Sequence, residues 1–199
     1  MTKRRCRRGV LFSHPIWFAL ARLPFRRHNH AAPTVEAPVS GQQALSHIPA
    51  GRQTMSYMGC EMVALFNALH FLGRPRPLNE IIRLFEDRRW LLLGGRWGAD
   101  PFAVGIYARE NSLAHTVFRG KQEYDDFARA LSDGGDRVFI LSFWLKDSVF
   151  SGAHTVALVR REGVLWGYNL FNGQTAPIPV SDLSCLCYAQ RFIVGYAFH

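Results

Sequence analysis

The chain has 199 residues, of which 48% are hydrophobic and 13% aromatic. This composition excludes a disordered or low-complexity protein, because enough apolar surface is available to offset the entropy lost on folding. The net charge is +9, but residues 1–30 carry eight of the 24 Lys and Arg residues and no acid, which leaves 16 basic and 15 acidic residues elsewhere. Since the positive charge is confined to one end, we expect no basic patch on the fold and no nucleic-acid partner.

The first fifty residues predict a tail and a linker. Residues 1–30 combine a basic start with an apolar stretch that His14 and Pro15 interrupt. Three interpretations of this segment stay open: an export leader, a basic anchor that associates weakly with a membrane surface, and an overlong start site. Residues 30–53 are rich in Ala, Pro, Gly, Ser and Gln without periodicity, which indicates a linker. We therefore expect a poorly ordered segment over residues 1–50 and a folded domain over 51–199, in the cytoplasm if the segment is neither leader nor anchor.

Helices are predicted in the first half of this domain. Residues 59–72 place apolar side chains on most sides of a helix, and Gly73 stands where a C-cap is expected. A helix over residues 101–111 is opened by Asp-Pro, a favourable N-cap and first-turn pair. Helical spacing also covers residues 78–85 and 124–131, and residues 114–118 form a short strand candidate.

Strands dominate the second half. The runs 137–144, 154–161, 164–170 and 191–198 are rich in β-branched and aromatic residues and are separated by turn residues. Glu162-Gly163 predicts a tight hairpin between the second and third of these runs. The order of elements indicates an α+β domain, with a helical half packed on a mostly antiparallel sheet.

Three residues from separate elements suggest nucleophilic catalysis. Cys60 stands in the first turn of a buried helix, where the helix dipole and free N–H groups should lower the pKa of the thiol and bind an oxyanion. His154 opens a strand and supplies a general base. The hairpin brings the start of that strand beside Asn169, which would orient the imidazole. Asn172, in an Asn-Gly turn, is the competing choice.

The order of these motifs resembles a known superfamily. Gly59-Cys60 at the head of a core helix, the run AHTVALV at 153–159, the hairpin turn and Tyr168-Asn169 are similar to papain-like cysteine peptidases. The nearest group is the bacterial bacteriocin-processing peptidases, which cleave double-glycine leaders, with their stand-alone relatives. The resemblance covers roughly residues 53–170.

The resemblance implies a papain-like fold with residues 51–199 as the catalytic domain, and thiol peptidase or amidase chemistry on a peptide or protein substrate. It assigns Cys60 as nucleophile, His154 as general acid and base, Asn169 as orienter and Gln53 as oxyanion donor, with no cofactor and no metal. Because Gln53 lies one residue further from the cysteine than the family pattern places it, Thr54 and Ser56 are alternative donors. Glu61 stands where the leader peptidases usually have glycine, and we expect it to cap the helix.

Two other functions fit the same residues. One is acyl transfer on the same fold, as in a deamidase or transglutaminase. The other is a catalytically silent module that binds a peptide without cutting it. Cys185 and Cys187 are expected to pack in the core, and together with His115 they predict no metal site.

Overall fold

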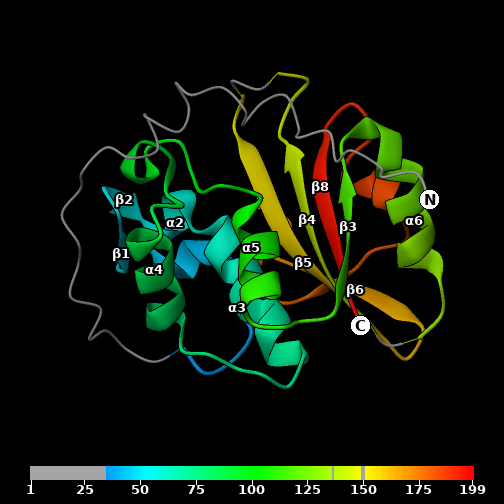
Figure 1. Cartoon of the computed structure of the whole chain (residues 1–199), viewed down its shortest axis with the longest axis horizontal. Helices are drawn as coiled ribbons and strands as arrows, with labels where there is room; N and C mark the ends of the chain where they lie inside the picture. Colours follow the sequence, from blue (N-terminus) through cyan, green and yellow to red (C-terminus); the bar gives the residue numbers. More distant parts are fainter. Residues whose placement is uncertain (1–34, 136, 149–150) are drawn as a thin grey trace, which may run out of the picture.

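The computed structural model describes residues 35–135, 137–148 and 151–199. It is an α+β fold in which a six-stranded antiparallel sheet separates two groups of helices (Figure 1). Helices α2 to α5 lie on one side of the sheet and α6 lies on the other. None of the helices in these described segments has the length and hydropathy to span a bilayer.

Each helix predicted from the sequence is present, with ends that shift by a few residues. The helices are α2 (Met55–Met58), α3 (Cys60–Phe71), α4 (Leu78–Asp87), α5 (Ala103–Glu110) and α6 (Tyr124–Ser132). The chain leaves α3 through Gly73, whose φ of 68° is the left-handed conformation that glycine adopts without steric cost. The amides of Gly73 and Arg74 donate to the carbonyls of His70 and Leu69, so the predicted C-cap is confirmed.

The sheet has the order β3-β8-β4-β5-β6-β7 and every neighbouring pair is antiparallel. Its strands are β3 (His115–Arg119), β4 (Arg137–Trp144), β5 (Ala153–Arg161), β6 (Val164–Tyr168), β7 (Ile178–Pro179) and β8 (Phe192–Phe198). Glu162 and Gly163 both have positive φ, 51° and 79°, as the predicted tight hairpin requires. Two-residue strands escaped sequence analysis: β7, and the pair β1 (Pro49–Ala50) and β2 (Gln53–Thr54), because so short a segment has no period.

Two buried clusters cover the two faces of the sheet. On one face α3 packs against β5 and β4, and apolar residues of both sides meet there, including Ile140 and Ala157. On the other face α6 packs against β3 and β8, around an aromatic group that includes Phe127, Phe139 and Phe143. We call these the α3 face and the α6 face.

The packed domain begins earlier than the expected boundary at residue 51. Val39, Leu45, Ile48 and Ala50 are buried in the cluster on the α3 face. The Asn67 side chain in α3 accepts from the Val39 amide (2.8 Å) and donates to the Val39 carbonyl (2.9 Å). A buried amide therefore anchors a segment whose composition indicated a linker. The expectations for residues 1–34 lie outside the described residues.

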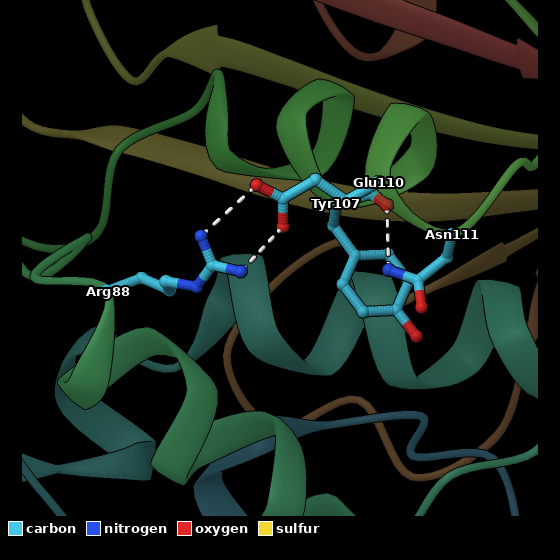
Figure 2. Close-up of polar contacts among 4 residues, drawn as sticks. All are labelled: Arg88, Tyr107, Glu110 and Asn111. Carbon is cyan, nitrogen blue, oxygen red and sulfur yellow. Dashed lines mark hydrogen bonds and ion pairs between the residues drawn. The ribbon is translucent and has the colours of Figure 1, made fainter.

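Contacts on the surface tie α4 to α5 (Figure 2). Arg88, directly after α4, donates to both carboxylate oxygens of Glu110 at the end of α5, at 3.1 and 2.9 Å. The Asn111 side chain donates to the Tyr107 carbonyl at 2.9 Å and so caps the last turn of α5. The ion pair links the ends of α4 and α5, whereas the Asn111 bond lies within α5.

Candidate active site

Cys60 is the first residue of α3, and Gly59 is its N-cap. The thiol lies against Thr155 of β5. Burial raises the pKa of this thiol, while the nearby main-chain N–H groups of Thr155, Glu61 and Cys60 and the nearby Thr155 hydroxyl lower it. Because burial dominates, the expectation of a lowered pKa from the helix dipole is wrong, and the resting group is a neutral thiol.

Glu61 is buried beside the thiol and is 2% exposed. One carboxyl oxygen accepts a hydrogen bond from the Thr155 hydroxyl, and the other, Oε1, has no hydrogen-bond partner in the described structure. The pKa of Glu61 is raised well above its ordinary value, first by burial, then by the charges of Cys60 and Asp100. The predicted capping role is therefore wrong, because the carboxyl lies in the interior, where burial favours its neutral form.

Hydroxyl groups extend this polar region across the α3 face. The Ser142 and Thr155 hydroxyls are hydrogen-bonded at 2.9 Å, on paired residues of β4 and β5. Tyr196 donates to the Pro101 carbonyl at 3.0 Å. Burial raises the pKa of the nearby Asp100. The nucleophile candidate thus lies in a buried region with acids beside it, and burial disfavours a thiolate there.

His154 and Asn169 are in contact as predicted, but the contact is made by the main-chain carbonyl of Asn169 and not by its side-chain amide. The imidazole Nε2 lies 2.6 Å from the main-chain carbonyl oxygen of Asn169. Since a carbonyl only accepts, Nε2 carries the proton and Nδ1 holds the lone pair. Burial lowers the pKa of His154, and the hydrogen bond to Asn169 partly opposes this. The ring is therefore neutral at pH 7, as a general base must be.

The Asn169 side chain does not orient the imidazole, which corrects the expected role of this amide. Asn169 has a φ of 60°, a left-handed conformation that asparagine tolerates. It directly follows β6, and its carbonyl reaches the start of β5. The side-chain oxygen instead accepts from the Gln42 amide at 2.9 Å.

The structure does not join the thiol and the imidazole directly. His154 pairs with Phe143, and their rings meet edge-on at 5.9 Å on the α6 face, whereas the Cys60 thiol reaches Thr155 on the α3 face. Successive residues of a strand point to opposite faces. Across the described residues no hydrogen bond connects Cys60 with His154. The imidazole belongs to His154 and the thiol contacts the next residue, Thr155, so the two groups lie on opposite faces of β5.

The edge of β5 next to His154 is open. The ladder between β5 and β6 ends at the pair Ala157–Tyr168, three residues short of His154. The imidazole reaches across this edge to the Asn169 carbonyl.

The expected oxyanion donor and the competing asparagine lie elsewhere. Gln53 belongs to β2 and pairs with Ala50, and α2 intervenes between it and Cys60. The alternative donors, Thr54 and Ser56, hydrogen-bond each other at 2.9 Å. The Asn172 side chain accepts from Gln43 at 2.9 Å in an exposed position, so the choice of Asn169 over Asn172 agrees with the geometry.

Sequence analysis missed Gln42, which lies in the segment interpreted as linker. Its main-chain N–H donates to Asn169 Oδ1 at 2.9 Å, and its Oε1 accepts from Asn169 Nδ2 at 2.8 Å. Its Nε2 donates to the Ser56 carbonyl at 2.9 Å. The two residues are 127 positions apart, and no local pattern marks such a pair.

Cys185 and Cys187 lie in different environments. Cys187 is buried as expected, but Cys185 is exposed, and its sulfur lies 3.1 Å from the Ser181 hydroxyl. In the described part of the chain no three His, Cys, Asp or Glu residues are grouped as metal ligands.

Comparisons with protein-family models, curated proteins and solved structures found no match to this chain.

Proposed function

We propose that the chain is a papain-like thiol hydrolase that cleaves a peptide or amide bond, with Cys60 as nucleophile and His154 as general acid and base. The observation that carries this proposal is the 2.6 Å contact between His154 Nε2 and the Asn169 carbonyl. It leaves Nδ1 of His154 as a neutral base. His154 directly precedes Thr155, the residue that the Cys60 thiol contacts. A thiol at a helix start, a base and a fixed orienter are the parts that thiol catalysis needs.

The proposed reaction first brings Nδ1 of His154 to the Cys60 thiol. Nδ1 takes the thiol proton while the sulfur bonds to the substrate carbonyl carbon. The carbon–nitrogen bond then breaks, and the imidazolium returns the proton to the leaving amine. Water, losing a proton to the same Nδ1, adds to the thioester, and the carbon–sulfur bond breaks to release the acid and the thiol.

Main-chain N–H groups are the best candidates to stabilise the oxyanion that forms on the substrate. The main-chain N–H groups of Cys60, Glu61 and Thr155 lie close enough to the sulfur to lower the pKa of the thiol. When the sulfur attacks, the substrate oxygen lies close to the same sulfur and to these donors. Preorganised amides of this kind supply much of the stabilisation of an oxyanion, so no side-chain donor such as Gln53 is required.

Exposed apolar side chains favour a peptide substrate with apolar residues. Tyr57 is 64% exposed, Phe171 54% and Leu145 48%. Each stands near the site along the chain: Tyr57 in α2 before Cys60, Phe171 after Asn169, and Leu145 between β4 and β5. Aromatic and aliphatic surface of this kind binds apolar side chains by excluding water.

Hydrolysis of a fluorogenic peptide library with varied residues on both sides of the scissile bond tests the proposal. Wild-type protein should release the fluorophore from members with apolar residues. Cys60→Ala and His154→Ala should each abolish this release, while Cys185→Ala, which removes the exposed thiol, should leave it unchanged. Added amine nucleophiles separate hydrolysis from acyl transfer, because a transferase would form the amide instead of the acid. Turnover that survives in Cys60→Ala sinks the proposal.

A silent peptide-binding module is the second candidate, and one observation favours it. The buried Glu61 carboxyl lies beside a thiol whose pKa is already raised, and the imidazole faces the other side of the sheet. If wild type cleaves no library member, and wild type and Cys60→Ala bind the same immobilised peptides with equal affinity, the module replaces the hydrolase.

A further inference from the structure

Gln42 connects the two halves of the candidate site. It is buried, with 6% of its surface exposed, and it is the first residue of the helical turn Gln42–Leu45. Its main-chain N–H and its side-chain oxygen make two hydrogen bonds to the Asn169 side chain, and its Nε2 donates to the Ser56 carbonyl. The oxygen and the nitrogen of this side-chain amide therefore each have a defined partner, as buried polar groups require.

These bonds hold Asn169 in its left-handed conformation. The Asn169 main-chain N–H also donates to the Ser40 carbonyl at 2.9 Å, so residues 40–42 contact both the backbone and the side chain of Asn169. A non-glycine residue at φ 60° is disfavoured intrinsically and persists where its surroundings hold it. The direction of the Asn169 carbonyl, and with it the hydrogen bond to His154, depends on this hold.

The third bond of Gln42 reaches the nucleophile side. Ser56 belongs to α2, which ends at Gly59, the residue that also caps α3. A continuous series of hydrogen bonds thus runs from the His154 ring through Asn169 and Gln42 to the segment before Cys60.

We propose that Gln42 is a positioning residue, which fixes the tautomer and orientation of His154 by holding Asn169. The catalytic consequence rests on the proposed function; the structural consequence does not. Loss of the Gln42 side chain removes the bond from Asn169 Nδ2 and leaves only the two main-chain bonds to Asn169. The Asn169 carbonyl is then held less firmly against Nε2, so the imidazole redistributes its proton between the two nitrogens. Misplacing a base by about 1 Å lowers turnover on the order of a hundredfold, whereas substrate affinity changes little.

The test combines nitrogen NMR of the His154 ring with peptide hydrolysis. In wild type the ring should be the Nε2–H tautomer. In Gln42→Ala it should become a mixture, with kcat reduced about tenfold to a hundredfold and KM unchanged. The neighbouring Gln43→Ala, which removes only the exposed contact to Asn172, is the matched control and should alter neither measurement.

Two further variants keep the outcome decisive. Gln42→Glu retains an acceptor for Asn169 Nδ2 but loses the donor to Ser56, so it should keep the Nε2–H tautomer. Asn169→Gly accepts the left-handed backbone but removes the amide that Gln42 holds, so it should reproduce the tautomer mixture even where Gln42→Ala does not fold. A tautomer mixture without any wild-type hydrolysis would overturn the proposed function and leave the positioning role standing. An unchanged Nε2–H tautomer in folded Gln42→Ala or Asn169→Gly overturns the role itself.

Discussion

The two faces of the sheet bury side chains of different chemistry. Under α3, the neighbourhood of Cys60 holds a carboxyl and hydroxyls, and Glu61 Oε1 has no hydrogen-bond partner in the described structure. On the α6 face the Phe127 ring contacts the rings of Phe139 and Phe192 at centroid distances of 6.2 and 5.4 Å. Buried polar groups cost stability unless they are fully paired, whereas aromatic packing contributes it.

This contrast indicates which face of the sheet bears the candidate chemistry and which face contributes most to stability. The α6 face supplies a well-packed aromatic core, although it also has a buried polar group: Arg160 donates to the Leu131 carbonyl of α6, and its Nε has no hydrogen-bond partner in the described structure. The α3 face bears an unpaired carboxyl oxygen and a neutral thiol, which stability alone does not call for. Substitutions on the two faces should therefore separate: changes near Cys60 act on chemistry, and changes near Phe127 act on folding.

The largest expected effect is the loss of activity in Cys60→Ala. Turnover should fall about 10⁴-fold or more, because the nucleophile is removed. The free energy of unfolding should change by less than about 1 kcal/mol, since the substitution deletes one small atom at a helix end. Steady-state kinetics and urea denaturation of the same preparation measure both. A marked loss of stability with turnover retained would break the contrast between the faces.

Phe127→Ala should give the opposite pattern. Phe127 is fully buried among Phe118, Phe139 and Phe192, and deleting such a ring costs about 3–5 kcal/mol in the free energy of unfolding. Hydrolysis at a temperature where the variant is folded should match wild type. Phe171→Ala, at a 54% exposed position, is the control for stability and should change it by less than about 0.5 kcal/mol.

Glu61→Gln should change the pH dependence of stability. The folded-state pKa of Glu61 is raised above its ordinary value of 4.5 by burial. The folded state then binds the proton more tightly than the unfolded chain, so the free energy of unfolding is highest below pH 4.5 and falls as the pH rises through the folded-state pKa. Urea denaturation across this window should show a smaller fall in Glu61→Gln.

Part of that fall should remain in Glu61→Gln, because burial also raises the pKa of Asp100. Glu80→Gln, in an exposed part of α4, is the matched control and should follow wild type. A wild-type stability that rises over the same window would contradict a protonated Glu61.

The smallest expected effect is that of Arg88→Ala. Its ion pair with Glu110 is well formed, but the side chains are 50% and 40% exposed. Pairs in such positions contribute between zero and about 1 kcal/mol. Thermal unfolding at low and high salt should show a small difference that shrinks with salt. A larger loss of stability would mean that the ion pair between α4 and α5 also stabilises the packing on the α3 face.

Sequence analysis predicted the elements well because their causes are local. The alternating and β-branched runs match β4 and β5, the Glu162-Gly163 turn is a tight hairpin, and the apolar surround of residues 59–72 matches the burial of α3. It also placed His154 beside Asn169, since hairpin pairing is determined by a short turn. The papain-like assignment and the catalytic roles remain proposals.

What the sequence alone determined was the periodicity, the turns and the pairing across one hairpin, all of which depend on neighbours a few residues apart. Only the tertiary structure decided which face of β5 the imidazole joins, that Glu61 is buried rather than capping α3, and that Gln42 holds Asn169. Each of these depends on contacts between distant segments. Burial and hydrogen bonding there outweigh local preference, because desolvation of a polar group costs more than a helix dipole or a propensity contributes.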